Sequence, residues 1–289
     1  MSLLTRAWIA AARARRRRGR PSPDDWERSR LDWVREHAPG RSFADVGGLF
    51  AHAGNVAFAA ERAGATAVTE FDAGDAHLTG FTARHEAEGS RIRVVQGDLE
   101  DPVSVERLGP HDVVWCTGVV YHTPNPVRQL MLLRTVTREL LYLGTHTIPE
   151  VPGLRHACVY YPHLDAGDRR AYAAPHWEPE REGMVGLGTP FDDAPMHGHA
   201  NFWWGISPSA LRAMLRTARF EVVEERRNHQ TPFNLDVVAR PVARPPSLPP
   251  PSYYRERAER RERGEPEPPL DGYYDERPEP SAAFGTPPG

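Results

Sequence analysis

The chain has 289 residues, of which 39% are hydrophobic and 26% charged, so it can bury one large core or two small ones. All 36 basic residues are arginines, which excludes a Schiff-base lysine and the lysine of a Walker-type phosphate loop. Two cysteines, Cys116 and Cys158, without a CxxC pair argue against a zinc ribbon, an iron–sulfur site and a disulfide-stapled secreted fold.

Residues 1–23 form a basic arm, with seven arginines, no acidic residue and the run Arg13–Arg20. Such a run can bind the phosphates of RNA or an anionic membrane surface through charge alone. In a chain without lysine, however, arginine is frequent everywhere, so we favour a solvated chain end. No apolar run approaches the roughly 20 residues of a membrane span. We therefore expect a cytoplasmic protein without a membrane span.

Residues 24–240 alternate short apolar runs with helical patterns, and we expect them to form one domain. The predicted strands cover residues 43–46, 67–71, 92–96, 113–116, 140–144, 220–224 and 234–238. We predict one helix that begins at Asp24, three that cover residues 56–62, 76–87 and 127–138, and one that begins at Ser207-Pro208. Apolar strands separated by helices predict right-handed βαβ crossovers, and hence a doubly wound, mostly parallel, seven-stranded α/β sheet with a closing antiparallel hairpin.

The alternation is interrupted at residues 148–206, which are rich in proline, histidine and aromatic residues. We interpret this segment as an insert on the substrate side of the domain. Its aromatic residues either line a lid over a substrate or form the insert's own small core. Residues 241–289 contain 13 prolines interleaved with Arg/Glu pairs, which predicts a disordered C-terminal tail.

The strongest motif is FADVGGLFAHAGNVAFAA at residues 43–60, where a strand ends, glycines follow and a helix of small residues begins. Glycine lets the backbone approach a ligand closely, and the amides at a helix start can meet a polar group. Three more strand ends carry an acid or a glycine, in VTEFD, VVQGD and CTGVVYHTPNP. The carboxyl ends of parallel strands share one edge of a sheet, so these motifs predict a crevice of nucleotide size.

This ordered set of motifs resembles the class I S-adenosylmethionine-dependent methyltransferases over residues 41–240. The resemblance implies a Rossmann-like fold, S-adenosylmethionine (SAM) as cofactor and S-adenosylhomocysteine (SAH) as product. It implies that the glycine loop holds the methionine part, Asp72 the ribose hydroxyls, and Asp98 with Leu99 the adenine edge. The cofactor-binding residues would be Asp45, Gly47, Gly48, Gly54, Asp72, Asp98, Leu99 and Gly118.

The glycine loop departs from the usual D-x-G-x-G-x-G pattern because it is longer, which leaves the roles of Gly48, His52 and Gly54 open. It also lacks the G-x-G-x-x-G of dinucleotide enzymes, so a nicotinamide dehydrogenase is the weaker alternative. The segments GVVYHTPNP and NFWWGISPSALRAMLRTARFEVVE are similar to tRNA wobble-uridine carboxymethyltransferases and their small-molecule relatives.

We expect O-methylation of a small molecule, such as a sugar or a secondary metabolite. The first alternative is a tRNA-modifying transferase that uses the basic arm to bind RNA. The second is a non-catalytic binding module that keeps the fold, for which the long glycine loop is the best support. The sequence carries no signal for an oligomeric state.

His122, shortly after the fourth strand, is the candidate general base for a hydroxyl acceptor. Alternatively, it packs against or caps the helix that follows.

Asp192-Asp193 and His197-Gly-His199 have the residue types of a metal site, but such histidines are more often loop or substrate-contacting residues, and we expect no metal. Cys116 is expected to be a packed thiol. The candidate substrate-binding residues are Tyr121, His146, His197, His199, Trp203 and Trp204.

Overall fold

The computed structural model describes residues 23–50, 53–165, 167–168, 202–227, 234–242 and 251–268, together with the single residues 7 and 10. The predictions for the run Arg13–Arg20, for His52, and for Asp192, His197 and His199 lie outside these residues. No helix within the described ranges is long and apolar enough to cross a membrane.

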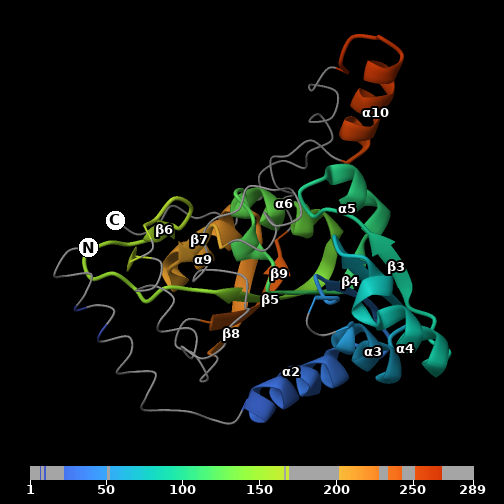
Figure 1. Ribbon diagram of the computed structural model, residues 1–289, viewed down its shortest axis with the longest axis horizontal. Coiled ribbons are helices and arrows are strands. Elements are labelled where there is room, and N and C mark those ends of the chain that lie inside the picture. The colour runs from blue at the N-terminus through green and yellow to red at the C-terminus, as the bar shows by residue number, and fades with distance from the viewer. Residues whose placement is uncertain are drawn as a thin grey trace.

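A seven-stranded sheet forms the centre of the molecule, in the order β3-β2-β1-β4-β5-β9-β8 (Figure 1). Strands β1 to β5 are parallel to one another, and β9 is antiparallel to both β5 and β8. The strands are β1 (Ser42–Val46), β2 (Ala67–Asp72), β3 (Arg93–Gln96), β4 (His111–Thr117), β5 (Thr137–His146), β8 (Phe220–Arg227) and β9 (Asn234–Pro241). The predicted doubly wound, mostly parallel α/β sheet with a closing antiparallel hairpin is confirmed.

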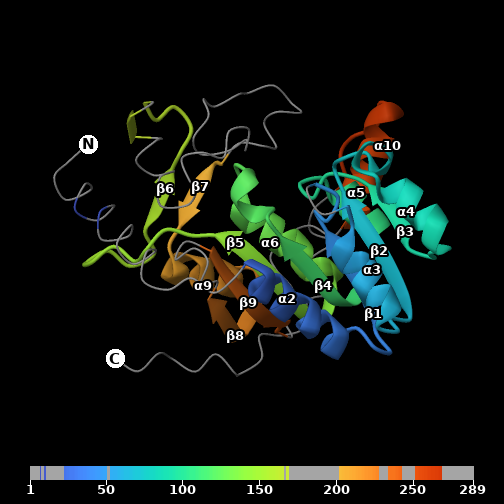
Figure 2. The same cartoon turned by 60° about the horizontal axis from the view of Figure 1, so that its bottom comes forward.

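Six helices cover the two faces of the sheet, and Figures 1 and 2 show α2 and α3 on the opposite side from α5 and α6. One face carries α2 (Pro23–His37), α3 (Asn55–Arg62) and α4 (Phe81–Glu88), and the other carries α5 (Pro102–Leu108), α6 (Pro126–Val136) and α9 (Pro208–Thr217). Each face has its own apolar cluster, one around Trp33, Phe58 and Trp115, the other around Leu130, Leu211 and Val237. Strands buried on both faces explain the nearly continuous apolar runs in the sequence.

Two predicted helices differ from the structure in their bounds. The helix predicted over residues 76–87 is divided into the 3₁₀ helix η1 (Ala76–Thr79) and α4 by Gly80, which has a φ of +80°. The helix predicted to reach residue 138 ends at Val136, because Thr137 is extended and pairs with His111 on β4. Pairing with a neighbouring strand overrides the helical pattern there.

Helix α5 was not predicted, although its start has a clear local cause. The carboxylate of Asp101 accepts hydrogen bonds from the backbone N–H groups of Val103 (3.1 Å) and Ser104 (3.0 Å), and Pro102 is the first helical residue. An acidic N-cap followed by proline is a common helix start. With seven residues, the helix is too short for its periodicity to stand out in the sequence.

The C-terminal tail contains a helix that was not expected within a disordered segment, α10 (Pro251–Glu262). Tyr253 is buried, Arg255 forms an ion pair with Glu106 on α5, and the guanidinium of Arg128 on α6 lies 5.6 Å from the ring centre of Tyr254. These contacts hold α10 against the domain, as the red helix beside α5 in Figure 1 shows. The remaining tail, residues 243–250 and 269–289, lies outside the described part.

The part of the insert that the structure describes contains a second, two-stranded sheet. Strand β6 (Cys158–Tyr160) pairs antiparallel with β7 (Trp204–Ile206), which leads into α9. The bridge between Thr147 and Ile206 ties this small sheet to the end of β5. The insert therefore rises from the carboxyl edge of the main sheet, where the sequence motifs lie.

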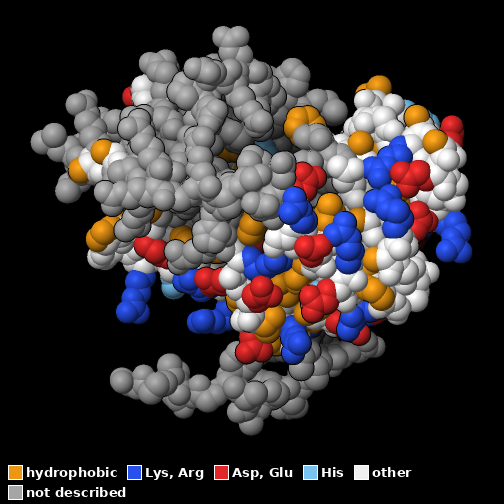
Figure 3. Space-filling model, turned by 90° about the horizontal axis from the view of Figure 1, so that it is seen from below, with side chains coloured by type: hydrophobic (Ala, Val, Ile, Leu, Met, Phe, Trp, Pro, Cys, Tyr) orange, Lys and Arg blue, Asp and Glu red, His pale blue; other side chains and the backbone are white. Residues whose placement is uncertain are grey.

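Positive and negative side chains are interleaved on the face of the molecule seen in Figure 3. Ion pairs such as Arg41 with Glu139 (2.9 Å) and Arg62 with Glu88 (3.0 Å) join helices and strands at the surface. Over the described part of that face, arginines do not gather into the basic stripe that RNA binding needs.

Candidate active site

The glycine loop, residues 47–54, connects β1 to α3. Gly47 and Gly54 have φ angles of +81° and +72°, a conformation that residues with a Cβ rarely adopt. The N–H of Gly47 donates to the carbonyl of Phe71 on β2 at 2.8 Å. A Cβ at Gly47 would collide with the side chain of Val119, so the loops after β1 and β4 approach each other closely. The glycines here are required by the close packing of two loops.

Two buried carboxyl groups lie beneath the glycine loop. Asp45 accepts a hydrogen bond from the N–H of Ala57 (3.1 Å), and Glu70 accepts one from the N–H of Gly48 (3.1 Å). A Cβ on Gly48 would lie 2.7 Å from the Cγ of Asp45 and 2.9 Å from Oε1 of Glu70. Only glycine fits between these two acids and the loop.

Burial keeps this pair from ionising fully. It raises the pKa of Asp45 to about 7. Burial, together with the negative charges of Asp45 and Asp72, raises the pKa of Glu70 well above its ordinary value. The pair therefore keeps a proton to higher pH than two exposed carboxyl groups would. The sequence analysis missed Glu70, although an acid inside the apolar strand VTEFD is a signal, because residues 70 and 72 point to the same face of a strand.

The acids predicted to bind the ribose and the adenine lie at the ends of the neighbouring strands β2 and β3. Asp72 accepts hydrogen bonds from the N–H groups of Leu49 (3.0 Å) and Gly74 (2.7 Å). Asp98 accepts one from the N–H of Glu100 (2.8 Å) and lines a cavity of about 730 Å³ beside the edge strand β3. The side chain of Leu99 is buried in the apolar core. Two carboxylates thus stand at one edge of the sheet, held by backbone amides.

The end of β4 turns at Gly118, which has a φ of +79° and donates its N–H to the carbonyl of Gly144 at 2.9 Å. The 3₁₀ helix η2 (Val120–His122) follows and carries Tyr121 and the half-buried His122. Burial raises the pKa of Tyr121 to about 12, against the opposing effect of the positive charge of Arg30. Its phenol therefore keeps its proton and can donate a hydrogen bond.

An aromatic cluster surrounds His122 on the insert side. The ring of Phe202 lies 4.5 Å from that of Tyr121, 5.1 Å from that of His146 and 5.2 Å from that of His122, centre to centre. His146 and the hydroxyl of Tyr161 are 3.1 Å apart, within hydrogen-bonding distance. Burial, and secondarily the charge of His122, lower the pKa of His146 to about 3. This wall of the site is aromatic and, at His146, uncharged at neutral pH.

The two tryptophans predicted to bind substrate have different positions. The backbone of Trp203 joins the cluster, because its N–H donates to the carbonyl of Tyr121 and its carbonyl accepts from the N–H of Tyr161, both at 2.9 Å. The indole of Trp204 donates to the carbonyl of Pro124 at 3.1 Å. Trp204 thus covers the loop before α6. Tyr121, His122 and His146 all contact the ring of Phe202, and Cys116 is fully buried in the core, as expected of a packed thiol.

Comparison with known proteins gives a result at the level of fold. No protein-family model and no curated protein matches the chain. The N-terminal domain of EvdMO1, solved with SAH bound, is 21% identical over 78% of this chain and 83% of that chain, with a TM-score of 0.50. The [4+2]-cyclase SpnF is 15% identical over 78% of this chain and 84% of that chain, also with a TM-score of 0.50.

A third solved structure, an O-methyltransferase family protein from Burkholderia thailandensis, is 14% identical over 75% of this chain and 56% of that chain, with a TM-score of 0.50. The chain thus spans a little over half of that protein. Together with the strand order and the motifs at the carboxyl edge, these likenesses lead to one conclusion: the chain has the fold of the class I S-adenosylmethionine-dependent methyltransferase superfamily.

Proposed function

We propose that this protein is a SAM-dependent methyltransferase that methylates a hydroxyl group of a small molecule. The observation that carries the proposal is the meeting of the glycine loop, Asp72 and Gly118 at one edge of the sheet. Val46 pairs with both Phe71 and Cys116, so the loops after β1, β2 and β4 begin at the same level. The strand ends supply a backbone cradle and a carboxylate, which suit a nucleoside with an amino acid attached.

The residues present fit this cofactor. At the left-handed Gly118, a Cβ would come no closer than 3.8 Å to the Tyr121 hydroxyl, so the backbone of the β4 loop has room to approach a ligand. Asp72 would hold the ribose hydroxyls, and Asp98 the adenine edge. When bound, SAM supplies a methyl group on a positively charged sulfur.

The methyl acceptor would bind between the cofactor and the residues of η2 and the aromatic cluster. His122 would take the proton of the acceptor hydroxyl, and Tyr121 would orient the acceptor with its protonated phenol. Phe202 and Tyr161 would exclude water from the reacting atoms and align the acceptor, which is the main requirement of methyl transfer. An enclosed aromatic wall favours a compact acceptor over a polymer. The presence of a [4+2]-cyclase among proteins of similar fold makes the cofactor the first point to test.

Calorimetric titration of the full chain with SAM, SAH and NAD tests the proposal. We expect binding of SAM and SAH, no binding of NAD, and an affinity for SAH reduced at least about tenfold in Asp72→Asn, because a charge-assisted hydrogen bond to ribose is lost. Asp75→Asn is the matched control, since Asp75 is exposed and its carboxylate accepts the nearby N–H of His77 (2.8 Å). A wild-type chain that binds neither SAM nor SAH would refute the proposal.

A further inference from the structure

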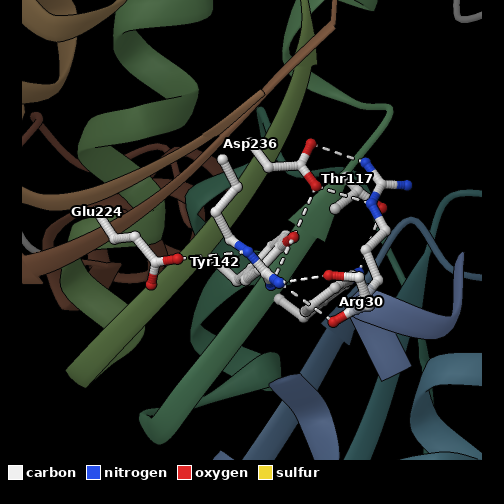
Figure 4. Close-up of polar contacts among 8 residues, drawn as sticks. Arg30, Thr117, Tyr142, Glu224 and Asp236 are labelled. Carbon is white, nitrogen blue, oxygen red and sulfur yellow. Dashed lines mark hydrogen bonds and ion pairs between the residues drawn. The ribbon is translucent and has the colours of Figure 1, made fainter. Parts of the chain in front are cut away.

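Arg30 joins helix α2 to strand β9 of the main sheet. On α2, its Nε and Nη2 donate to the two carboxylate oxygens of Asp236 on β9, at 2.7 and 2.8 Å (Figure 4). Asp236 is completely buried, whereas 24% of the Arg30 side chain is exposed. The ion pair uses one edge of the guanidinium. Within the part of the chain that the structure describes, Nη1 has no hydrogen-bond partner.

The cluster around this ion pair contains more positive than negative buried charge. The hydroxyl of Tyr142 donates to Asp236 (2.7 Å), and a second guanidinium, that of Arg226, bonds Ser29 Oγ (2.6 Å) and reaches the Tyr142 hydroxyl at 3.5 Å. Arg226 forms an ion pair with Glu224 at 3.4 Å, and the side chain of Glu224 is half-exposed. Asp236 is thus the fully buried carboxylate of a cluster that contains two largely buried guanidinium groups, and the cluster can accept a further anion.

The cluster lies at the carboxyl edge of the sheet, beside the proposed cofactor site. Asp236 pairs with Gly144 on β5, and Gly144 pairs with Thr117 at the end of β4. A Cβ on Gly144 would lie 2.9 Å from Nη2 of Arg30 and 2.8 Å from Asp236 Oδ1, so this glycine makes room for the ion pair. The carbonyl of Gly144 accepts the N–H of Gly118, the residue where the β4 loop turns.

A second observation places the guanidinium near the acceptor loop. The positive charge of Arg30 acts on the phenol of Tyr121 and lowers its pKa, against the larger effect of burial. A Cβ on Gly118 would lie 3.8 Å from that same hydroxyl. Arg30, Gly118 and Tyr121 are therefore parts of one small region, between the glycine loop and the aromatic cluster.

We propose that the edge of the Arg30 guanidinium that is not paired with Asp236 binds the carboxylate of the amino-acid part of the cofactor, which makes helix α2 part of the cofactor site. This inference rests on the proposed function. Arginine is suited to the role because one edge of its planar group can stay paired with Asp236 while the other binds a second carboxylate. The chain has no lysine to provide an alternative cation. Asp236 would act as a positioning residue that fixes the guanidinium.

The test compares a ligand that carries the amino-acid carboxylate with two ligands that lack it. Wild-type protein is titrated calorimetrically with SAH, with an SAH analogue in which hydrogen replaces the carboxylate, and with 5′-methylthioadenosine. We expect SAH to bind about 10- to 100-fold more tightly than the decarboxylated analogue, the range of one charge-assisted pair. In Arg30→Gln, the affinity for SAH should fall by about the same factor, while the affinity for both other ligands stays within about threefold.

Two variants separate binding from folding. Arg30→Gln combined with Asp236→Asn removes both charges of the ion pair, so no buried carboxylate is left unpaired, and it should show the same loss of preference for SAH. Arg226→Gln removes the other guanidinium and should keep the full preference. Thermal unfolding checks that each variant is folded at the titration temperature.

Three results would overturn the inference. The first is equal affinity of the wild-type protein for SAH and the decarboxylated analogue. The second is an equal loss of affinity for all three ligands in the Arg30 variants, which would show a purely structural role. The third is a wild-type protein that binds none of the ligands. That result refutes the proposed function itself and is seen before any variant is made.

Discussion

At the scale of single residues, the unusual feature is the pair of acids beneath the glycine loop. Asp45 and Glu70 are 1% and 0% exposed, and each accepts the N–H of a residue that begins or follows the loop. A buried pair of this kind retains a proton to avoid two adjacent negative charges. The loop is thus supported from below by a pair of acids that keeps a proton more readily than exposed carboxyl groups do. That arrangement makes the stability of the protein depend on pH.

The sign of this dependence follows from the raised pKa values. An acid whose pKa is higher in the folded than in the unfolded chain binds its proton more tightly when folded. The contribution of the pair is therefore greatest below about pH 4, near the ordinary pKa of a carboxyl group, and is lost as the pH rises toward 7 and beyond.

Replacing Glu70 by glutamine should reduce this loss. Glu70→Gln keeps an acceptor for Gly48 but removes one titrating group, so the free energy of unfolding should fall less steeply as the pH rises above about 5, by up to about 1.4 kcal/mol per pH unit. Urea unfolding at a series of pH values measures the slope. The exposed Glu86→Gln should leave it unchanged. An unaltered slope in Glu70→Gln would show that Glu70 does not hold the proton.

His146, in the aromatic cluster, makes the stability of the protein depend on pH in the opposite sense. Because its pKa is lowered to about 3 in the folded chain, the unfolded chain binds the proton more readily, and stability decreases as the pH falls below about 6.5. His146→Gln should weaken this acid destabilisation, whereas replacement of the exposed His77 by Gln should not. Urea unfolding between pH 4 and 7 measures the effect. Equal acid sensitivity of both variants would contradict the burial of a neutral His146.

At the scale of elements, local capping determines where the helices near the site begin. The hydroxyl of Ser207 accepts the N–H of Ala210 at 3.3 Å, and Pro208 occupies the first position of α9. Ser207 also follows β7 directly, so its cap fixes the point at which the insert returns to the main sheet. The predicted start of this helix is confirmed.

Loss of that cap should destabilise the protein measurably. Ser207→Ala leaves the N–H of Ala210 without its partner in a buried position and should lower the free energy of unfolding by about 1 kcal/mol. Thr217→Ala, at the exposed end of the same helix, should change it by less than about 0.5 kcal/mol. Urea unfolding measures the free energy of unfolding of both variants. Equal losses in the two would exclude a capping role for Ser207.

At the scale of the whole molecule, the chain is joined by an ion pair whose partners are 206 residues apart. Arg30 on the opening helix and Asp236 on the last strand lie side by side because β9 is inserted next to β5. The hydroxyl of Tyr142 on β5 donates a hydrogen bond to the same carboxylate. The N-terminal helix is thus attached to the sheet by charge as well as by the apolar contacts of Trp33 and Val34.

Removing the negative charge of Asp236 should destabilise the folded protein. Asp236→Asn leaves the largely buried guanidinium of Arg30 without its carboxylate partner and should lower the free energy of unfolding by about 3 kcal/mol. Asp32→Asn is the control, since it breaks only the exposed pair with Arg35 and should cost less than about 0.5 kcal/mol. If denaturant unfolding shows similar small losses for both, the cluster does not hold α2 in place.

The sequence by itself determined the sheet, the glycine loop and the acids at the strand ends, because apolar periodicity and turn residues act over a few neighbouring positions. It therefore predicted Asp72, Asp98 and Gly118 at one edge. Only the tertiary structure decided that Glu70 meets Asp45, that His146 is buried against Tyr161, and that Arg30 reaches Asp236. Those contacts depend on strand order and register, which join residues far apart in the chain and leave no local periodic signal.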